Sequence, residues 1–292
     1  MVKNFDGIHS AIFSVYDENL NIKKDTVRKM VDHQKKCGIK GFYVGGNTGE
    51  CSVLPNRTRK DMLEAVIEER GDMQVIAHIG AVRWEDTVDL VKHADSMPID
   101  AIASLPPSLG LCAYTTEETI DYYTALSEYT DKPIFAYITG VYKGDLVELA
   151  EKFAKAPNII GIKLSVPNYY GFERIRNANS DMILFNGPDE SMLSGLIMGA
   201  NGAIGTSYNI LPETAIQVYN NFKNGDLDKA FAAQNKLNDM IALAAGRNMS
   251  FWKALLEVKE GFDMGYTVFP AKKVTQEEKE LISNLFKRIG EL

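Results

Sequence analysis

Short apolar runs alternate along this chain with longer amphipathic stretches. The longer stretches place apolar residues at helical spacing, as Val27, Met30 and Val31 do, and this periodicity predicts helices with one buried face. We predict helices at 25–38, 56–71, 85–97, 116–130 and 145–156. The short runs predict strands at 12–15, 41–46, 74–80, 101–106, 133–138, 159–165, 182–187 and 202–207.

Roughly eight strands, each followed by a helix, predict an α/β fold of the (β/α)8 TIM-barrel type. An open doubly wound sheet is the alternative, but that fold usually places a glycine-rich phosphate turn after its first strand. No GxGxxG follows the first predicted strand. After residue 210 only helices are predicted, so we expect a barrel over 1–224 and a C-terminal helical extension of the same domain over 225–292.

The overall charge limits the classes of partner that this protein can bind. The chain has 292 residues and a formal net charge of −7, without the clustered Lys and Arg that nucleic acids or anionic membranes require. No apolar run is long enough to cross a bilayer, and the N-terminal sequence lacks the features of a signal peptide. We therefore expect a cytoplasmic protein with no nucleic-acid or membrane partner.

Cysteines and histidines offer no recognisable motif. The 3 cysteines are odd in number and far apart, which predicts reduced thiols. The 4 histidines form no HxH, HExxH or His–Cys cluster, so we expect no metal site.

One predicted strand, at 159–165, carries a lysine among apolar residues, although lysine is rarely fully buried unless it is paired or used. Alternation divides this strand into two faces, Ile159, Gly161, Lys163 and Ser165 against Ile160, Ile162 and Leu164. We expect the aliphatic face to meet the outer helices. Lys163 then points into the barrel near the C-terminal end of the strand, where barrel active sites lie, and Gly161 leaves room for its stem.

Other polar groups gather at the same end of the predicted barrel. The same parity directs Phe135 and Tyr137 inward from strand 133–138, with Tyr137 near the top. Three more strands end in the polar, glycine-rich segments GGNTGE (45–50), FNGPDE (185–190) and IGTS (204–207), and the turn at 205–207 also suits a phosphate.

This combination predicts imine chemistry. Burial disfavours a charged ammonium, and a neutral amine is a nucleophile toward ketones. The protonated imine would withdraw electrons from a neighbouring carbon–carbon bond. Tyr137 could move a proton to or from a substrate hydroxyl, while Thr48 and the backbone N–H groups of its turn could hold a carboxylate.

Each residue also has a purely structural interpretation. Lys163 could form a core ion pair, and Tyr137 could be a packing aromatic. Asp189 and Glu190 could be first-turn acids favoured by a helix dipole. His78 is expected to be an interior histidine with satisfied hydrogen bonds.

Taken together, these motifs resemble the N-acetylneuraminate lyase and dihydrodipicolinate synthase family of pyruvate-dependent class I aldolases, over nearly the whole chain. YVGGNTGE (43–50) resembles the family's carboxylate-binding turn. Tyr137 in IFAYI resembles its catalytic tyrosine, and Lys163 in GIKLS its Schiff-base lysine. The segment 185–210 is most similar to the N-acetylneuraminate lyase branch.

The resemblance implies substrates, site residues and assembly. It implies pyruvate and a keto sugar acid as ligands, a covalent imine on Lys163 with no metal or organic cofactor, and a homotetramer. It also implies substrate contacts from Asn47, Thr48, Ser165, Gly187, Asp189, Glu190 and Thr206, of which Gly187, Asp189 and Glu190 would contact the polyhydroxy tail.

This chain departs from the family pattern at several positions. Asn47 stands where the family has a hydroxyl residue, Y-I-T-G follows the tyrosine motif in place of Asn and a nearby Pro, and 105–114 lacks the usual aromatic pair, for which Tyr114 is the available substitute. The stretch 137–143 also lacks the arginine with which synthases bind their second substrate, which argues against dihydrodipicolinate synthesis.

The function we expect is reversible cleavage of N-acetylneuraminate to N-acetylmannosamine and pyruvate. Two alternatives stay open. One is a related pyruvate aldolase or synthase-like enzyme with another aldehyde partner, suggested by Asn47 and the altered 105–114 segment. The other is a catalytically impaired barrel that only binds such ligands.

Overall fold

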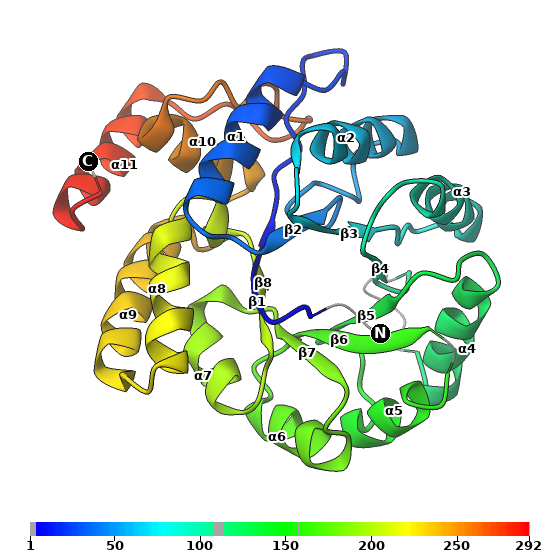
Figure 1. Ribbon diagram of the computed structural model, residues 1–292. Coiled ribbons are helices and arrows are strands. Elements are labelled where there is room, and N and C mark those ends of the chain that lie inside the picture. The colour runs from blue at the N-terminus through cyan, green and yellow to red at the C-terminus, as the bar shows by residue number, and fades with distance from the viewer. Residues whose placement is uncertain (1–3, 108–113, 157, 292) are drawn as a thin grey trace.

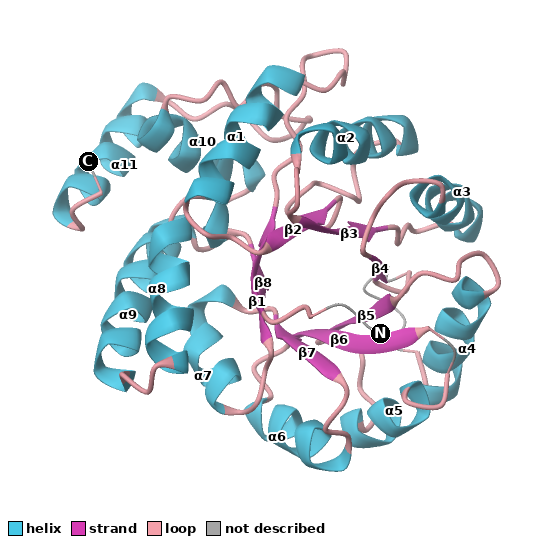
Figure 2. Ribbon diagram, viewed as in Figure 1, coloured by secondary structure: helices cyan, strands magenta, loops and turns pink. Residues whose placement is uncertain are grey.

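Eight parallel strands close into a barrel in the order β1 to β8, and helices surround it (Figures 1 and 2). The computed structural model describes residues 4–107, 114–156 and 158–291. The predicted (β/α)8 barrel with C-terminal helices is therefore confirmed. Its strands are β1 Gly7–Ala11, β2 Gly41–Val44, β3 Gln74–His78, β4 Ala101–Ser104, β5 Ile134–Thr139, β6 Ile159–Ser165, β7 Ile183–Asn186 and β8 Gly202–Gly205.

The helices alternate with the strands as predicted. All five predicted helices are present, with ends within three residues of their predicted positions. The α-helices are α1 Lys24–Lys36, α2 Asn56–Glu69, α3 Trp84–Asp95, α4 Thr116–Ser127, α5 Leu146–Phe153, α6 Tyr169–Ala178, α7 Met192–Ile197, α8 Pro212–Lys223, α9 Leu227–Ala244, α10 Met249–Glu260 and α11 Gln276–Arg288. Two 3-10 turns, η1 Asp189–Ser191 and η2 Ser207–Asn209, follow β7 and β8.

The prediction of the first strand is wrong. The run at 12–15 is buried but lies after β1, whose Gly7 is paired with Gly202 of β8 and whose His9 is paired with Gly41 of β2. The apolar pattern at 12–15 indicates only that these residues are buried. Which segment forms the first strand depends on which backbone pairs with β8 and β2. The other seven strands were predicted within two residues at each end.

Two apolar clusters hold the fold. The larger fills the space between the barrel and its helices. The smaller lies inside the barrel and is built from inward side chains of most strands and of the N-terminal segment, namely Phe5, Ala11, Tyr43, Ile76, Ala101, Ala103, Phe135, Phe185 and Ile204. The barrel is thus filled at its base, mostly by apolar side chains, and its C-terminal end is where a site can open.

Strand β6 follows the predicted alternation only in part. Its register with β5 shifts between Ile134 and Phe135, so the first two residues of β6 exchange faces: Ile159 packs with the outer cluster and Ile160 against the inner one. Beyond the shift, Ile162 and Leu164 pack outward as expected. The shift is a bulge-type irregularity, which parity arguments cannot anticipate.

Gly161 is closely surrounded by the two neighbouring strands. A Cβ atom at this position would lie 2.4 Å from the Ile183 carbonyl oxygen and 2.6 Å from Cε1 of Phe135. The glycine therefore accommodates both strands, and the expected room for the stem of Lys163 stays a prediction.

After residue 210 the described chain is helical, as predicted. Helix α9 packs on α8, and α11 packs against α10 and α9 (Figure 1). The proposed division after residue 224 falls between α8 and α9 and stays a prediction. No helix among the described residues is long and apolar enough to cross a membrane.

Candidate active site

Lys163 lies inside the barrel near its C-terminal end and is only 6% exposed. Its Nζ lies 4.2 Å from the centroid of the Tyr137 ring and 4.6 Å from that of Tyr43. Among the described residues, no carboxylate forms an ion pair with it. A core ion pair, the structural alternative for this lysine, is therefore absent from the described part of the chain.

Tyr43 was missed in the sequence, although the same parity argument on strand 41–46 places it inward. Its ring packs edge-on against Tyr137, and its hydroxyl is buried without a hydrogen-bond partner in the described structure. Burial raises the pKa of this hydroxyl well above its usual value, so it stays protonated and available as a donor.

Tyr137 points inward from β5, as predicted, and is 5% exposed. Its hydroxyl accepts a long hydrogen bond, 3.5 Å, from Nδ2 of Asn47. The phenol is therefore not bound tightly by another group, which leaves its oxygen free to face a ligand.

The turn after β2 brings Asn47 and Thr48 to the mouth of the barrel. Within the described residues, the N–H groups of Thr48 and Gly49 have no hydrogen-bond acceptor. The Thr48 hydroxyl lies 2.6 Å from that of Thr206, at the end of β8. Unpartnered N–H groups beside a hydroxyl form the kind of concavity that binds carboxylates.

Arg59 and His78 hold this turn from below. The buried Arg59 guanidinium donates to the carbonyl oxygens of Gly45 and His78, at 3.4 and 3.0 Å. His78 Nδ1 lies 3.0 Å from the Gly45 carbonyl oxygen, and its Nε2 accepts from the N–H of Leu105 at 3.2 Å. Burial and the nearby Arg59 lower the pKa of His78 to about 3, so the ring is neutral. The expectation of a satisfied interior histidine is confirmed.

Ser165 and Gly187 form a close contact between the ends of β6 and β7. A Cβ atom on Gly187 would lie 2.8 Å from Cβ of Ser165, and the Gly187 N–H donates to the Leu164 carbonyl oxygen at 2.9 Å. Only glycine at 187 lets the loop after β7 pass over Ser165 without displacing it.

Asp189 bridges the ends of β7 and β8. Its Oδ2 accepts from the N–H of Ser207 at 2.6 Å, and burial raises the pKa of its carboxyl group. The N–H that a phosphate would use at the 205–207 turn is thus already bound to a carboxylate. Glu190 lies in the same short 3-10 turn but is exposed, and its carbonyl oxygen accepts from Asn238.

The predicted site residues thus converge at one end of the barrel. Direct contacts link Lys163 with Tyr137, Tyr137 with Asn47, and Thr48 with Thr206. Asn47 and Glu190 are the exposed members of the predicted set. A small cavity of about 30 Å³ adjoins Tyr137 and is lined also by Tyr114, the expected substitute for the aromatic pair; residues 108–113 lie outside the described residues.

This chain is similar in sequence and in structure to known N-acetylneuraminate lyases and sialic acid aldolases. An N-acetylneuraminate lyase of Clostridium perfringens (strain SM101 / Type A) is 31% identical over 97% of this chain and 99% of its own. The solved structure of a catalytic lysine mutant of the Ruminococcus gnavus sialic acid aldolase has a TM-score of 0.92 and 28% identity, covering 99% of this chain and 97% of its own. CdNal from Clostridium difficile, solved in complex with mannosamine, has a TM-score of 0.90 and 30% identity, covering 98% of this chain and 100% of its own. The model of the dihydrodipicolinate synthetase family matches residues 4–289, and this chain belongs to that family.

Proposed function

We propose that this protein is a carbon–carbon lyase that cleaves N-acetylneuraminate to N-acetylmannosamine and pyruvate through an imine on Lys163. The relatives named above as N-acetylneuraminate lyase and sialic acid aldolase support the substrate class. Cleavage by this route needs no metal or organic cofactor, because the lysine itself supplies the electron sink.

One observation carries the proposal: a lysine without an acidic partner among the described residues points into the mouth of the barrel between two tyrosine rings. No ion pair competes with the reaction of this amine, whose neutral form is a nucleophile toward a carbonyl carbon. The positive charge of the imine then forms against two aromatic faces, which stabilise a nearby cation.

The steps balance without another reactant. The neutral Lys163 amine adds to the keto carbon of the sugar acid, the Tyr137 hydroxyl gives its proton to the departing oxygen, and loss of water leaves a protonated imine and a Tyr137 phenolate. The phenolate then accepts the proton of the hydroxyl on the carbon to be released, while the carbon–carbon bond breaks and its electron pair moves toward the imine nitrogen. Return of a proton to the resulting enamine carbon and addition of water release pyruvate and restore the amine.

The surrounding groups would hold the substrate at its two ends. We assign its carboxylate to the N–H groups of Thr48 and Gly49 and to the Thr48 hydroxyl. Ser165 and Thr206 would bind hydroxyl groups along the chain, and the loop from Gly187 to Glu190 would contact the polyhydroxy tail. Asn47 can donate a hydrogen bond to this network but cannot relay a proton as a hydroxyl would.

Trapping of the imine tests this proposal. Treatment with pyruvate and borohydride should add the mass of reduced pyruvate to the peptide that contains Lys163. Lys253 is the matched internal control, because it is also buried but its ammonium is bound to Glu50 at 2.5 Å. An unmodified Lys163 peptide, or modification spread over surface lysines, would overturn the proposed chemistry.

A second substrate class is favoured by Asn47 and its long 3.5 Å contact with Tyr137, since the family's hydroxyl is missing there. In that case the enzyme would cleave another 2-keto-3-deoxy sugar acid through the same imine. Pyruvate release from a panel of keto acids separates the two substrate classes. Binding without any Lys163-dependent release would identify the impaired barrel instead.

We also infer a homotetramer, from the family resemblance alone, and a cytoplasmic location, from the composition of the chain. Helices α7 and α9 present exposed apolar side chains, Ile197 and Phe231 being 51% and 60% exposed. Sedimentation of the purified protein measures the subunit number, and a monomer would remove the inference.

A further inference from the structure

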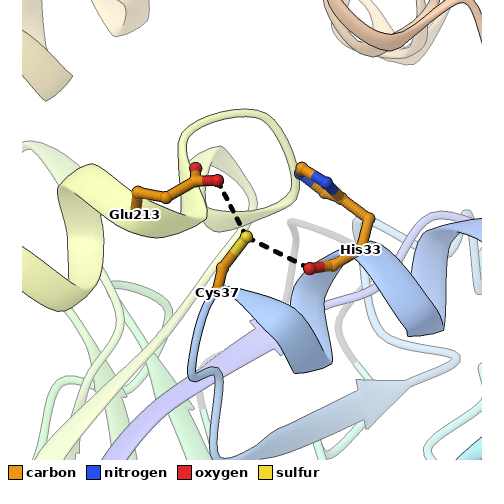
Figure 3. Close-up of side chains that lie close together, drawn as sticks. All are labelled: His33, Cys37 and Glu213. Atoms are coloured by element: carbon orange, nitrogen blue, oxygen red, sulfur yellow. Dashed lines mark hydrogen bonds between the residues drawn. The ribbon is translucent and has the colours of Figure 1, made fainter.

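A second cluster of chemically capable side chains lies outside the barrel, between α1, α8 and the end of α10. His33 and Cys37 are four residues apart at the C-terminal end of α1, and Glu213 comes from the first turn of α8. One side-chain donor atom from each of the three lies within 4.8 Å of the others. Figure 3 shows the Cys37 thiol between the Glu213 carboxylate and the α1 helix, with the His33 ring beside them.

The His33 ring is arranged like a metal ligand. Its Nε2 is buried and has no hydrogen-bond partner in the described structure. Its Nδ1 lies 3.8 Å from Oε2 of Glu260, at the end of α10. Imidazoles that bind metal through one nitrogen usually direct the other toward a carboxylate or carbonyl oxygen, which fixes the ring.

Cys37 and Glu213, taken one at a time, each have an ordinary structural explanation. The Cys37 thiol donates to the His33 carbonyl oxygen at 3.1 Å, an ordinary contact within a helix, and Glu213 is an acid in a first turn. Neither explains why a thiol, an imidazole and a carboxylate converge, with Cys37 Sγ only 2.9 Å from Oε1 of Glu213. Burial and the Glu213 carboxylate raise the pKa of the Cys37 thiol to about 12, which argues against a reactive nucleophile.

The charges around the cluster also suit a cation. Lys259 Nζ lies 4.0 Å from Oε2 of Glu213, 3.5 Å from Glu260 and 3.2 Å from Glu291, and Glu291 also pairs with Lys236 at 2.5 Å. Three carboxylates thus face two ammonium groups, a net charge of −1. A bound thiolate would bring this to −2, which a divalent ion neutralises.

We propose that His33, Cys37 and Glu213 form a binding site for a divalent transition-metal ion of the zinc class, with Glu260 orienting the imidazole. The donor set of thiolate, imidazole and carboxylate is one that zinc accepts, and a water molecule would complete a tetrahedron. With Zn–S near 2.3 Å and Zn–O near 2.0 Å, Sγ and Oε1 would lie about 3.5 Å apart, which small side-chain rotations provide. The ion would link the barrel helices α1 and α8, with α10 close by.

This proposal reverses the expectation of no metal site. The expectation that no His–Cys cluster exists is wrong for His33 and Cys37, because a spacing of four residues places both on one face of a helix. The third donor, Glu213, lies 176 residues beyond Cys37, so its approach depends on the closure of the barrel and no local motif reveals it.

Cobalt substitution tests the site without reference to catalysis. The full-length protein is freed of metal with a chelator and titrated with Co²⁺. We expect one ion per chain, a thiolate-to-cobalt charge-transfer band and the visible bands of tetrahedral cobalt. Cys37→Ser should abolish the charge-transfer band, and Glu213→Gln should keep the band but weaken Co²⁺ binding at least tenfold.

Cys51→Ser is the matched control, because Cys51 is also a partly buried thiol but lies near the barrel mouth. Its cobalt spectrum should equal that of the wild type. Absence of a charge-transfer band in the wild type, or loss of the band in Cys51→Ser and not in Cys37→Ser, would overturn the site. Zn²⁺ should also raise the melting temperature of the wild type but not of Cys37→Ser; if Cys37→Ser fails to fold, the Glu213→Gln titration decides.

Discussion

Two buried lysines of this protein have opposite surroundings. Lys253 is bound to Glu50 and lies over the Tyr16 ring, which makes it part of a closed polar network. Lys163 is also buried, but it lies over the Tyr43 and Tyr137 rings and forms no ion pair with a carboxylate among the described residues. An unpaired buried amine is costly for stability, and such a cost is typical of a functional group.

At Tyr137, loss of one oxygen atom should separate catalysis from stability. In Tyr137→Phe the ring and its contact with Lys163 remain, so we expect a change in the free energy of unfolding below about 1 kcal/mol. Turnover should fall about 10²- to 10⁴-fold if the phenol transfers the proton. Steady-state pyruvate release and urea unfolding measure the two quantities.

Tyr142→Phe serves as the control, because Tyr142 lines the same small cavity but bonds with its hydroxyl to Thr116 and to the Asp145 carbonyl oxygen. It should retain turnover within a few-fold. Equal losses in the two variants would show that Tyr137 acts only through packing.

Gly187 should be intolerant of even one added methyl group. In Gly187→Ala the new Cβ would lie 2.8 Å from Cβ of Ser165, which would push that side chain out of position. We expect at least a tenfold loss in kcat/KM with the lysine still trapped by borohydride. Gly140→Ala is the control, since its Cβ would lie 3.6 Å from Val166, an ordinary contact. Normal kinetics in Gly187→Ala would contradict the tight Ser165 contact.

For single residues, alternation along a strand correctly predicted that Lys163 and Tyr137 point into the barrel, because β5 and β6 stay regular at their C-terminal ends. The same rule failed at Ile159 and Ile160, where the register shift exchanges the two faces. The contact between Thr48 and Thr206 joins two distant turns and depends on barrel closure, so no local pattern predicted it.

The C-terminal helices support the site loops from behind. From α9, Gln234 donates to the Asp189 carbonyl oxygen at 3.0 Å and Asn238 to that of Glu190 at 3.0 Å. From α10, Lys253 binds Glu50 at the end of the turn that carries Thr48. The extension therefore positions both candidate binding loops, although it contributes no residue to the predicted site.

Removal of the Lys253 amine should destabilise the protein strongly. Lys253→Met leaves the Glu50 carboxylate buried without its cation, which costs about 3–5 kcal/mol in the free energy of unfolding. The control is Lys279→Met, whose pair with Glu257 is partly open to water and where a loss below about 1 kcal/mol is expected. Urea unfolding measures both. The double variant Lys253→Met, Glu50→Gln should recover most of the loss, and failure to recover it would contradict an electrostatic cause.

Elements with a clear period were predicted well, because helical amphipathicity and strand burial are local properties. The first strand was predicted at the wrong place, because 12–15 is more apolar than the true β1, GIHSA. What selects β1 is its pairing with β8 at the far end of the barrel sequence, and this is information that a local pattern does not contain.

The whole barrel encloses two neutral histidines at different depths. His9 is fully buried near Phe185, with Nε2 3.0 Å from Oε1 of Gln74, and burial lowers its pKa to about 4. His78 lies higher, under the turn after β2, with its pKa lowered to about 3. Their protonation is therefore coupled to opening of the entire fold.

This coupling predicts how stability depends on pH. Below pH 6.5 the unfolded chain binds protons at these histidines while the folded protein does not, so the free energy of unfolding falls as the pH decreases from about 7 toward 4. At pH 5.5 each histidine should contribute a loss of about 1.4 kcal/mol relative to pH 7.5.

The buried carboxyl of Asp189, whose pKa is raised, acts in the opposite direction, so the total dependence of stability on pH does not by itself reveal the histidines. The diagnostic quantity is the difference between wild type and His9→Gln, measured by urea unfolding at the two pH values: it should change by about 1.4 kcal/mol in favour of the variant at pH 5.5. A difference that does not vary with pH would mean that His9 takes up its proton without unfolding of the barrel.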